Sequence, residues 1–123
     1  MDYKNKKIAV IGVTNREDKF GFKIFRDLLK FGYKVKGVNP QNGEVLGNKI
    51  YKNLEDIEEA PDVVITVVPS VVTEKIVETC RRMNIGEIWM QPGSESEAAI
   101  KKAGDYGVKV FHGVCFMIEN NIW

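Results

Sequence analysis

Apolar residues along the chain gather in five short runs, separated by stretches with a different periodicity. Most of the runs are continuous and rich in Val and Ile, a pattern typical of strands that are covered on both faces of a sheet. The second run is weaker, because polar and apolar residues partly alternate in it. We therefore predict five strands, at residues 7–13, 33–38, 62–68, 86–90 and 108–111.

The stretches between these runs carry apolar residues at helical spacing, which predicts three helices. Their stripes are formed by Phe20, Ile24, Leu28 and Phe31, by Val72, Ile76, Cys80 and Met83, and by Ala98, Ala99, Ile100 and Ala103. Gly32 and Gly107 are placed to end the first and third helices. Ser94 and Glu97 have the spacing of a capping box at the start of the third helix. Residues 53–57 predict one short capped turn.

The predicted order is strand, helix, strand, short turn, strand, helix, strand, helix, strand. Parallel strands joined by helices through right-handed crossovers build a three-layer α/β domain, here with about five strands. Numbered along the chain, the strands are expected in the spatial order 3-2-1-4-5, by analogy with doubly wound α/β folds. Residues 41–53 are the least regular segment, in place of a full crossover helix. A chain of 123 residues without a linker or repeat predicts one domain, residues 1–123.

The composition argues against several functional classes of protein. The chain carries 18 basic and 17 acidic side chains, a net charge of +1, whereas a nucleic-acid-binding domain needs a cationic excess or a basic face. No apolar stretch approaches the length of about 18 residues that crosses a bilayer, and the N-terminus lacks a signal-peptide pattern. Cys80 and Cys115 make no disulfide framework, and with the single histidine, His112, they make no zinc site. We expect a cytoplasmic protein with reduced thiols and no bound metal.

Turn residues follow the predicted strands at their carboxyl ends, the edge at which open α/β sheets bind ligands. Three of the four prolines, Pro40, Pro69 and Pro92, stand there. Proline cannot continue the hydrogen-bond ladder of a central strand, so these residues could simply end the strands. Rigid turns that hold backbone groups in place for a ligand explain the prolines equally well.

The loop between the first strand and the first helix is the most informative part of this edge. Residues 12–21 begin and end with glycine, which allows the backbone to turn and the helix start to approach a phosphate closely. Backbone N–H groups at a helix N-terminus favour anions, so the loop predicts a phosphate site. Thr14, Asn15, Arg16 and Lys19 offer hydrogen-bonding groups and charge. A solvated polar loop with a turn glycine is the alternative interpretation.

This loop departs from the G-x-G-x-x-G pattern of dinucleotide-binding domains, because Thr14 and Glu17 stand at two of the glycine positions. A dinucleotide site also uses an acidic residue at the end of the second strand to hold the ribose hydroxyls, where this chain has Asn39. Both departures argue against NAD and leave a different phosphate-bearing ligand open.

Several motifs occur in an order and spacing that together carry a family resemblance. They are Ile11-Gly12-Val13-Thr14 with Gly21, Gly32-Tyr33-Lys34-Val35 with Val38-Asn39-Pro40, Leu46-Gly47 with Tyr51-Lys52-Asn53-Leu54, Asp62-Val63-Val64, Val68-Pro69, Ile88-Trp89-Met90-Gln91-Pro92-Gly93, and Cys115. The chain resembles, over about residues 7 to 119, the small CoA-binding domain family, whose members are relatives of the N-terminal domain of the succinyl-CoA synthetase α subunit. An NAD-binding domain is not expected to carry both the Asn-Pro and the Trp-x-Gln-x-Gly turns.

The resemblance implies a Rossmann-like domain that binds coenzyme A or an acyl-CoA across the carboxyl edge of its sheet, without catalysis of its own. The first loop is expected to hold the phosphates, with the candidates Gly12, Val13, Thr14, Asn15, Arg16, Lys19, Phe20 and Gly21. The next two turns are expected to flank adenosine and pantetheine, with the candidates Asn39, Pro40, Val68, Pro69, Ser70 and Thr73. The last candidates, expected nearer the pantetheine arm, are Gln91, Pro92 and Gly93.

Two departures from the family pattern concern the ligand. Relatives often have a basic residue directly after the Asn-Pro pair, where this chain has Gln41. This weakens the expected grip on a 3′-phosphate unless Arg16, Lys19 or Lys23 takes its place. Relatives also usually have a Gly-Ala-Ser-type first loop, and residues 12–14 keep its hydroxyl but add bulk.

Two other functions stay open: an NAD(P)-binding redox enzyme or sensor, and an interaction subunit with a vestigial nucleotide site. Gln41 and the apolar tail ending in Trp123 fit the second, because the tail could cover the sheet edge or a second subunit, which leaves a homodimer open. A thiol–imidazole pair of Cys115 and His112 is one hypothesis for that segment, and simple packing is the other. Cys80 is expected in the core.

Overall fold

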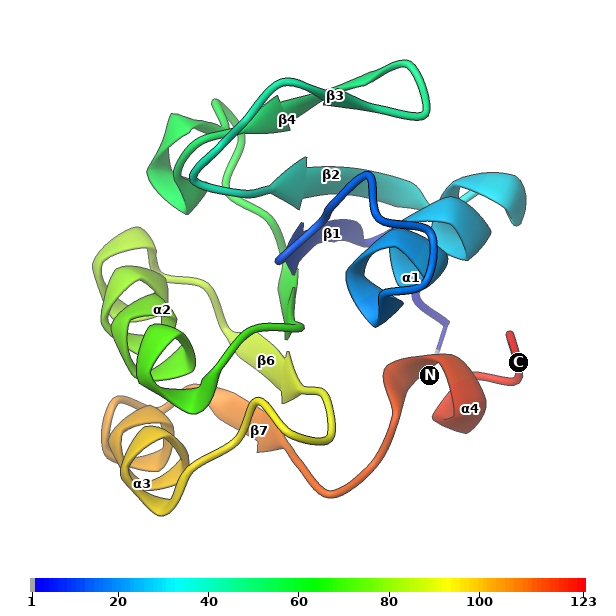
Figure 1. Ribbon diagram of the computed structural model, residues 1–123. Helices are drawn as coiled ribbons and strands as arrows, with labels where there is room; N and C mark the ends of the chain where they lie inside the picture. Colours follow the sequence, from blue (N-terminus) through cyan, green and yellow to red (C-terminus); the bar gives the residue numbers. More distant parts are fainter. Residues whose placement is uncertain (1) are drawn as a thin grey trace.

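The computed structural model describes residues 2–123. A central sheet is covered by α2 and α3 on one face and by α1 and α4 on the other (Figure 1). The elements are β1 (Lys7–Ile11), α1 (Phe20–Lys30), β2 (Lys34–Val38), β3 (Glu44–Val45), β4 (Asn48–Tyr51), the 3₁₀ turn η1 (Leu54–Asp56), β5 (Val63–Thr66), α2 (Ser70–Met83), β6 (Glu87–Met90), α3 (Glu97–Asp105), β7 (Lys109–Phe111) and α4 (Phe116–Glu119). The expected three-layer, Rossmann-like α/β class is confirmed.

The sheet has seven strands in the order β3-β4-β2-β1-β5-β6-β7, and every pair of neighbours is parallel except β3 with β4. The expected order 3-2-1-4-5 is wrong in one place. The third predicted strand, β5, pairs with β1 through Ile8 and Val63, and it does not lie beside β2. That place belongs to β4, which pairs with β2 through Gly37 and Ile50. The order differs because residues 41–53 supply strands of their own, and these fill the position next to β2.

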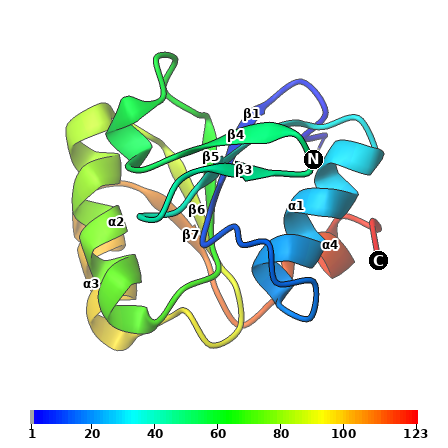
Figure 2. The same cartoon turned by 45° about the horizontal axis from the view of Figure 1, so that its top comes forward.

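Residues 41–53 form a β-hairpin where an irregular segment was expected. β3 and β4 are antiparallel, with Val45 opposite Asn48. Leu46 and Gly47 form the two-residue turn with φ of +52° and +76°. Positive φ at both central positions suits the natural twist of the two strands. Figure 2 brings this hairpin forward, at the end of the sheet beyond β2.

The continuous apolar runs coincide with strands that are buried on both faces. All four residues of β5 are buried, and so is every residue of β1 except Lys7. Alternate side chains feed two cores. One core, under α1 and α4, contains Phe25 and Phe116, and the other, under α2 and α3, contains Val77 and Ile88.

The predicted helix ends and the short turn are confirmed. Gly32 follows α1 and Gly107 follows α3, with φ of +80° and +76°. In the capping box of η1, the Asn53 backbone N–H donates to the carboxylate of Asp56 at 3.1 Å. These glycines adopt the left-handed conformation that a helix end requires.

The expected cap of α3 is wrong by two residues. Ser96, and not Ser94, caps the helix by accepting a hydrogen bond from the Ala99 backbone N–H at 3.0 Å. Ser94 is buried instead, and its hydroxyl lies within hydrogen-bond distance of the carbonyl oxygens of Thr66 and Gln91, at 3.0 and 2.8 Å. A buried hydroxyl needs such partners, so it is unavailable as a cap.

The C-terminal tail packs against α1, although it was expected to cover the sheet edge or a second subunit. The ring centroids of Trp123 and Phe20 lie 6.1 Å apart, and the Trp123 indole N–H donates to Asp27 Oδ2 at 2.6 Å. The Arg26 guanidinium also donates to the Asp27 carboxylate, at 2.8 and 3.2 Å. The Arg26 contact, assisted by Trp123, holds the pKa of Asp27 below its ordinary value despite burial.

These contacts predict an acid-sensitive tail. Because the folded-state pKa of Asp27 lies below its unfolded value of about 4, the carboxylate stabilises the fold above that pH, and its contribution is lost as pH falls through the folded-state pKa. We expect Asp27→Asn to lower the free energy of unfolding at pH 7 by about 1–2 kcal/mol, and by less at pH 3. Urea unfolding followed by tryptophan fluorescence measures both values.

The matched control is Asp105→Asn, which removes an exposed carboxylate paired with Lys101. Exposed pairs contribute little, so this control should change stability by less than about 0.5 kcal/mol. A loss in Asp27→Asn that stays constant from pH 7 to pH 3 contradicts the role given to the ionised carboxylate.

Candidate functional site

The carboxyl ends of β1, β2, β5 and β6 lie at one edge of the sheet, and α1, α2 and α3 begin there (Figure 1). The chain leaves β1 toward β2 over one face of the sheet and leaves β5 toward β6 over the other, so the strand order reverses between β1 and β5. Ligand crevices form at such a switch point. The topology therefore brings the loops that carry the candidate residues to one rim, called here the carboxyl edge.

Two glycines allow close packing at the end of β1, where Gly21 brings the start of α1 against it and Gly12 admits the backbone that follows β5. A Cβ on Gly21 would lie 2.0 Å from the carbonyl oxygen of Gly12, and a Cβ on Gly12 would lie 2.3 Å from the carbonyl oxygen of Val67. Gly12 also has a φ of +106°, which L side chains rarely adopt. Gly21 makes its close approach to the backbone of Gly12, and the expected approach of this helix start to a phosphate stays a prediction.

The helices that start at this edge differ in how the free backbone N–H groups of their first turns are capped. The first turns of α1 and α2 contain no acidic residue, and their N-cap residues, Lys19 and Pro69, provide no side-chain hydrogen bond. α3 is capped by Ser96 and carries Glu97 in its first turn. Unpaired N–H groups and the helix dipole favour anions, so the starts of α1 and α2 suit phosphate groups.

Polar side chains of the first loop are partly engaged with the protein itself. The Thr14 hydroxyl accepts a hydrogen bond from the Arg16 backbone N–H at 3.2 Å, and the Asn15 amide donates to the Glu44 carbonyl oxygen at 2.9 Å. The Arg16 guanidinium lies 3.5 Å from the Asp18 carboxylate, with both side chains largely exposed. This ion pair is weak enough to open for an incoming anion.

Other candidates of this loop differ in exposure. Val13 is buried, so its backbone rather than its side chain is available to a ligand. Lys19 is exposed, and Phe20 is 61% exposed at the start of α1. The Lys23 ammonium lies 5.5 Å from the centroid of the Phe20 ring. The beginning of α1 thus presents positive charge beside an accessible aromatic ring.

Asn39 joins the first loop to the second. Its side-chain amide donates to the Val13 carbonyl oxygen at 2.8 Å, and its side-chain oxygen accepts from the Gln41 backbone N–H at 2.8 Å. Its backbone N–H donates to the Tyr51 carbonyl oxygen at 2.9 Å. Pro40 stands exposed beside it. Asn39 therefore lies at the carboxyl end of β2, as expected, and its hydrogen bonds also hold the loops after β1 and β2 together.

The third loop leads directly into α2. Val68 and Ser70 are half-buried, and Pro69 between them is exposed. Thr73 is fully buried, and its hydroxyl has no hydrogen-bond partner in the part of the chain that the structure describes. Thr73 therefore lies behind the surface of the carboxyl edge, whereas the three preceding candidates lie on it.

Gln91 fastens the C-terminal segment to the end of β6. Its side-chain oxygen accepts from the Phe116 backbone N–H at 2.7 Å, and its amide donates to the Cys115 sulfur at 3.2 Å. Gln91 is 6% exposed, whereas Pro92 and Gly93 are exposed. The structure therefore gives the Gln91 side chain partners within the protein and leaves the turn after it accessible.

Sequence reasoning missed the role of Thr66 and Ser94, which together support this turn. The hydroxyl oxygens of Thr66 and Ser94 lie 2.9 Å apart in the interior, and Ser94 Oγ lies 2.8 Å from the Gln91 carbonyl oxygen. They connect the ends of β5 and β6. The sequence signal for this role was Thr66, a polar residue at the end of a buried apolar strand, because a buried polar side chain needs a hydrogen-bond partner.

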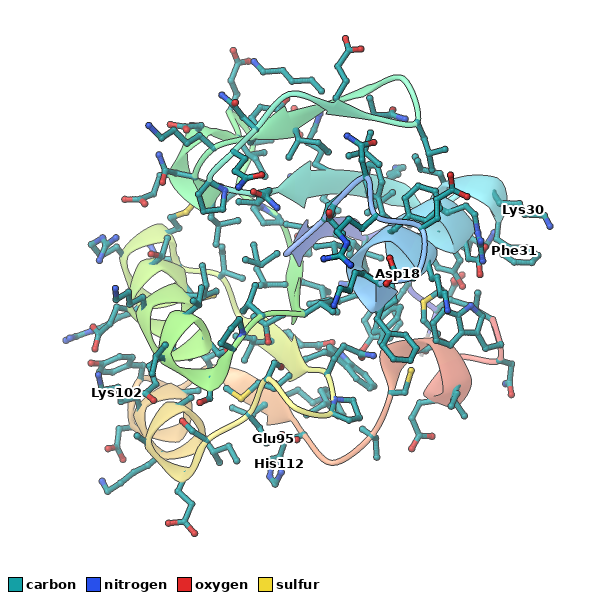
Figure 3. The ribbon with its side chains drawn as sticks, viewed as in Figure 1. Asp18, Lys30, Phe31, Glu95, Lys102 and His112 are labelled. Carbon is teal, nitrogen blue, oxygen red and sulfur yellow. The ribbon has the colours of Figure 1, made fainter. Side chains whose placement is uncertain are left out.

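Reactive side chains do not converge in the described residues. His112 is exposed after β7, and Figure 3 shows its side chain pointing outward. Cys115 is half-buried and receives its hydrogen bond from Gln91. Burial raises the pKa of the Cys80 thiol to about 12, and this residue lies in the core as expected. Residues 2–123 contain no cluster of three potential metal ligands and no helix long and apolar enough to cross a membrane.

Comparisons with known proteins identify the family. A model of the CoA binding domain matches residues 6–121, so the chain belongs to this family. It is 32% identical over 94% of its length to an ADP-forming acetate–CoA ligase of Methanocaldococcus jannaschii. It is 25% identical over 97% of its length to the uncharacterized protein YneT of Bacillus subtilis, of which it covers 88%. The resemblance inferred from the motifs is confirmed.

A solved structure shows the same fold. A conserved hypothetical protein from Pyrococcus furiosus superposes with a TM-score of 0.88 and 33% identity, over 93% of this chain and 98% of that one. The chain spans 18% of the length of the Methanocaldococcus ligase, so the match covers one part of that enzyme. The expected cytoplasmic location stays a prediction.

The glycine contact between β1 and α1 predicts unequal effects of the same substitution in two helices. Gly21→Ala forces a methyl group onto the Gly12 carbonyl, and we expect it to destabilise the protein by about 2 kcal/mol or more. Gly104→Ala, in α3, places its methyl group in open space, and we expect stabilisation of about 0.5–1 kcal/mol. Urea unfolding measures both, and equal effects would show that α1 is free to shift.

Proposed function

We propose that this chain binds coenzyme A or an acyl-CoA at the carboxyl edge, without catalysing a reaction of its own. Family membership supports the ligand class. The observation that carries the placement is the contrast between α1 and α2, whose first turns lack a side-chain cap and an acidic residue, and α3, which has both. The N-termini of α1 and α2 can each accept an anion, and two such sites suit a ligand that carries a diphosphate and a further phosphate.

The first loop suits the diphosphate. Contact between Gly12 and Gly21 holds the leading N–H groups of α1 at the switch point, where a phosphate can approach them. Lys19 and Arg16 are exposed beside these groups and supply positive charge. Phe20, exposed at the first position of α1, offers an apolar surface to the ligand next to that charge.

The second loop favours CoA over NAD. An NAD site uses a carboxylate at the end of the second strand to accept hydrogen bonds from the ribose. Asn39 stands there instead, and its amide is committed to the Val13 carbonyl oxygen. A ribose that carries a 3′-phosphate is repelled less by an amide than by a carboxylate, so this difference is consistent with a CoA ligand.

We propose binding without catalysis because the two thiols and the imidazole are not arranged to react together. The raised pKa of Cys80 keeps that thiol protonated and unreactive at neutral pH. Cys115 interacts with the Gln91 amide, and His112 extends outward. These contacts favour a packing role for the segment over a thiol–imidazole pair.

Thermal unfolding with and without ligand tests the proposal. At a CoA concentration of about 100 times Kd, binding adds about 2.7 kcal/mol to stability and raises Tm by several degrees. Ser70→Asp places a carboxylate in the first turn of α2. We expect it to stabilise the free protein by about 0.5 kcal/mol and to weaken CoA binding on the order of tenfold. Calorimetric titration measures the affinity.

Ala98→Asp is the matched control, because it adds the same charge to the first turn of α3, which Ser96 already caps. We expect it to leave CoA affinity nearly unchanged. Equal weakening by both substitutions would reduce the effect to net charge and contradict the assignment of α2. A larger Tm shift with NADH than with CoA would favour a redox protein, and no shift with either ligand would favour an interaction subunit.

A further inference from the structure

A groove with no part in the CoA proposal lies on the face of the sheet that carries α2. The crossover from β4 to β5 contains the single turn η1 in place of a full helix, so this part of the face lacks the usual cover. A cavity of about 570 Å³ opens there. We call it the basic groove, and define it by Lys7, Lys34, Lys36, Lys49 and Tyr51, which line it.

Strand register arranges the four lysines of the basic groove in two cross-strand pairs. Lys7 of β1 stands opposite Lys34 of β2. Gly37 of β2 stands opposite Ile50 of β4, so the residues one position earlier, Lys36 and Lys49, are neighbours across these two strands. Side chains alternate along a strand, and Lys34 and Lys36 are two residues apart, so all four ammonium groups leave the same face of the sheet. Like charges placed opposite each other in this way destabilise a sheet.

Three carboxylates of the lining offset part of this repulsion, and only one of them is paired with a lysine of the groove. Of the four lysines, Lys7 alone forms an ion pair within residues 2–123, with Glu59 at 3.4 Å and both side chains substantially exposed. Asp56, on the wall of the groove, is already bonded to the Asn53 backbone and side chain at 3.1 and 3.3 Å. Glu58 is the remaining carboxylate of the lining. The four lysines therefore exceed the three carboxylates of the lining by one positive charge, and Lys34, Lys36 and Lys49 form no ion pair within residues 2–123.

Tyr51 holds one lysine pair in place. The Lys49 ammonium lies 4.9 Å from the centroid of its ring, and the Lys36 ammonium lies 5.5 Å from it. Cation–π contacts of this kind restrict both long side chains without neutralising their charge. Both ammonium groups thus lie within 5.5 Å of the same ring, beside which an anion could contact them.

We propose that the basic groove binds a compact polyanion of the di- or triphosphate class. Successive phosphate groups can bridge the two lysine pairs and replace repulsion by charge-assisted hydrogen bonds, for which lysine serves as a point charge. Free inorganic polyphosphate and the phosphate chain of a nucleotide share this chemistry. None of the candidate residues of the carboxyl edge lines the groove, so the proposal does not depend on CoA binding.

NMR titration of the ¹⁵N-labelled protein tests this site, with sodium triphosphate, ATP and CoA added separately at constant ionic strength. We expect triphosphate to produce saturable shifts of the Lys36, Lys49 and Tyr51 amides. The double variant Lys36→Gln/Lys49→Gln should bind triphosphate at least about tenfold more weakly, because two charge-assisted contacts are lost. The ligand-free variant should also have a Tm equal to or above that of the parent, because repulsion is removed.

The matched control is Lys30→Gln/Lys75→Gln, which removes two exposed lysines that do not line the groove. We expect it to bind triphosphate as the parent does. Equal affinity for triphosphate and ATP would assign the groove to the phosphate chain of either source, and tighter ATP binding at the same amides would add a nucleoside contact.

Three results would overturn the proposal: equal weakening by the two double variants, absence of saturation, or shifts confined to residues 12–21. The last result would move triphosphate to the carboxyl edge. Ser70→Asp separates the two sites, because it should weaken CoA and leave triphosphate binding at the groove unchanged. If triphosphate does not bind at the basic groove, the CoA proposal is unaffected. If CoA does not bind, the proposal for the basic groove is unaffected.

Discussion

The contact between Gly12 and Gly21 determines how the carboxyl edge is built. Because Gly21 has no side chain, α1 begins directly against the end of β1, and its leading N–H groups are fixed at the switch point of the sheet. Asn39 then bonds to the Val13 carbonyl oxygen, so the second loop takes its position from the first. A bulkier residue at Gly21 would push the start of α1 away from β1, and one at Gly12 would clash with Val67 at the end of β5.

Much of the fold could be predicted because its strands are continuously apolar. Residues 63–68 are all β-branched, and the four of them that form β5 are buried on both faces. The β3–β4 hairpin could not be predicted, because its strands have two and four residues and Leu46 adopts a positive φ that its residue type does not favour. That omission alone changed the expected strand order.

The position of the candidate site was predictable, and the role of each side chain was not. Parallel topology places the strand ends together, which requires only the order of the elements. Asn39 and Gln91 are polar residues just beyond buried strands, as ligand-binding residues often are, yet both bond to the protein's own backbone. Likewise, no periodicity indicates that Lys36 and Lys49 become neighbours, because their pairing depends on the unpredicted hairpin.

The lengths of the outermost strands bear on aggregation. β3 has two residues and β7 has three, and each contains an exposed charged side chain, Glu44 and Lys109. Short, charged edge strands offer a poor template for β-pairing between molecules. The segments best suited to such pairing, in β1 and β5, occupy the centre of the sheet and are flanked by strands on both sides. The native protein therefore keeps its most amyloid-prone segments out of reach, and they become available for intermolecular pairing only when the sheet itself opens.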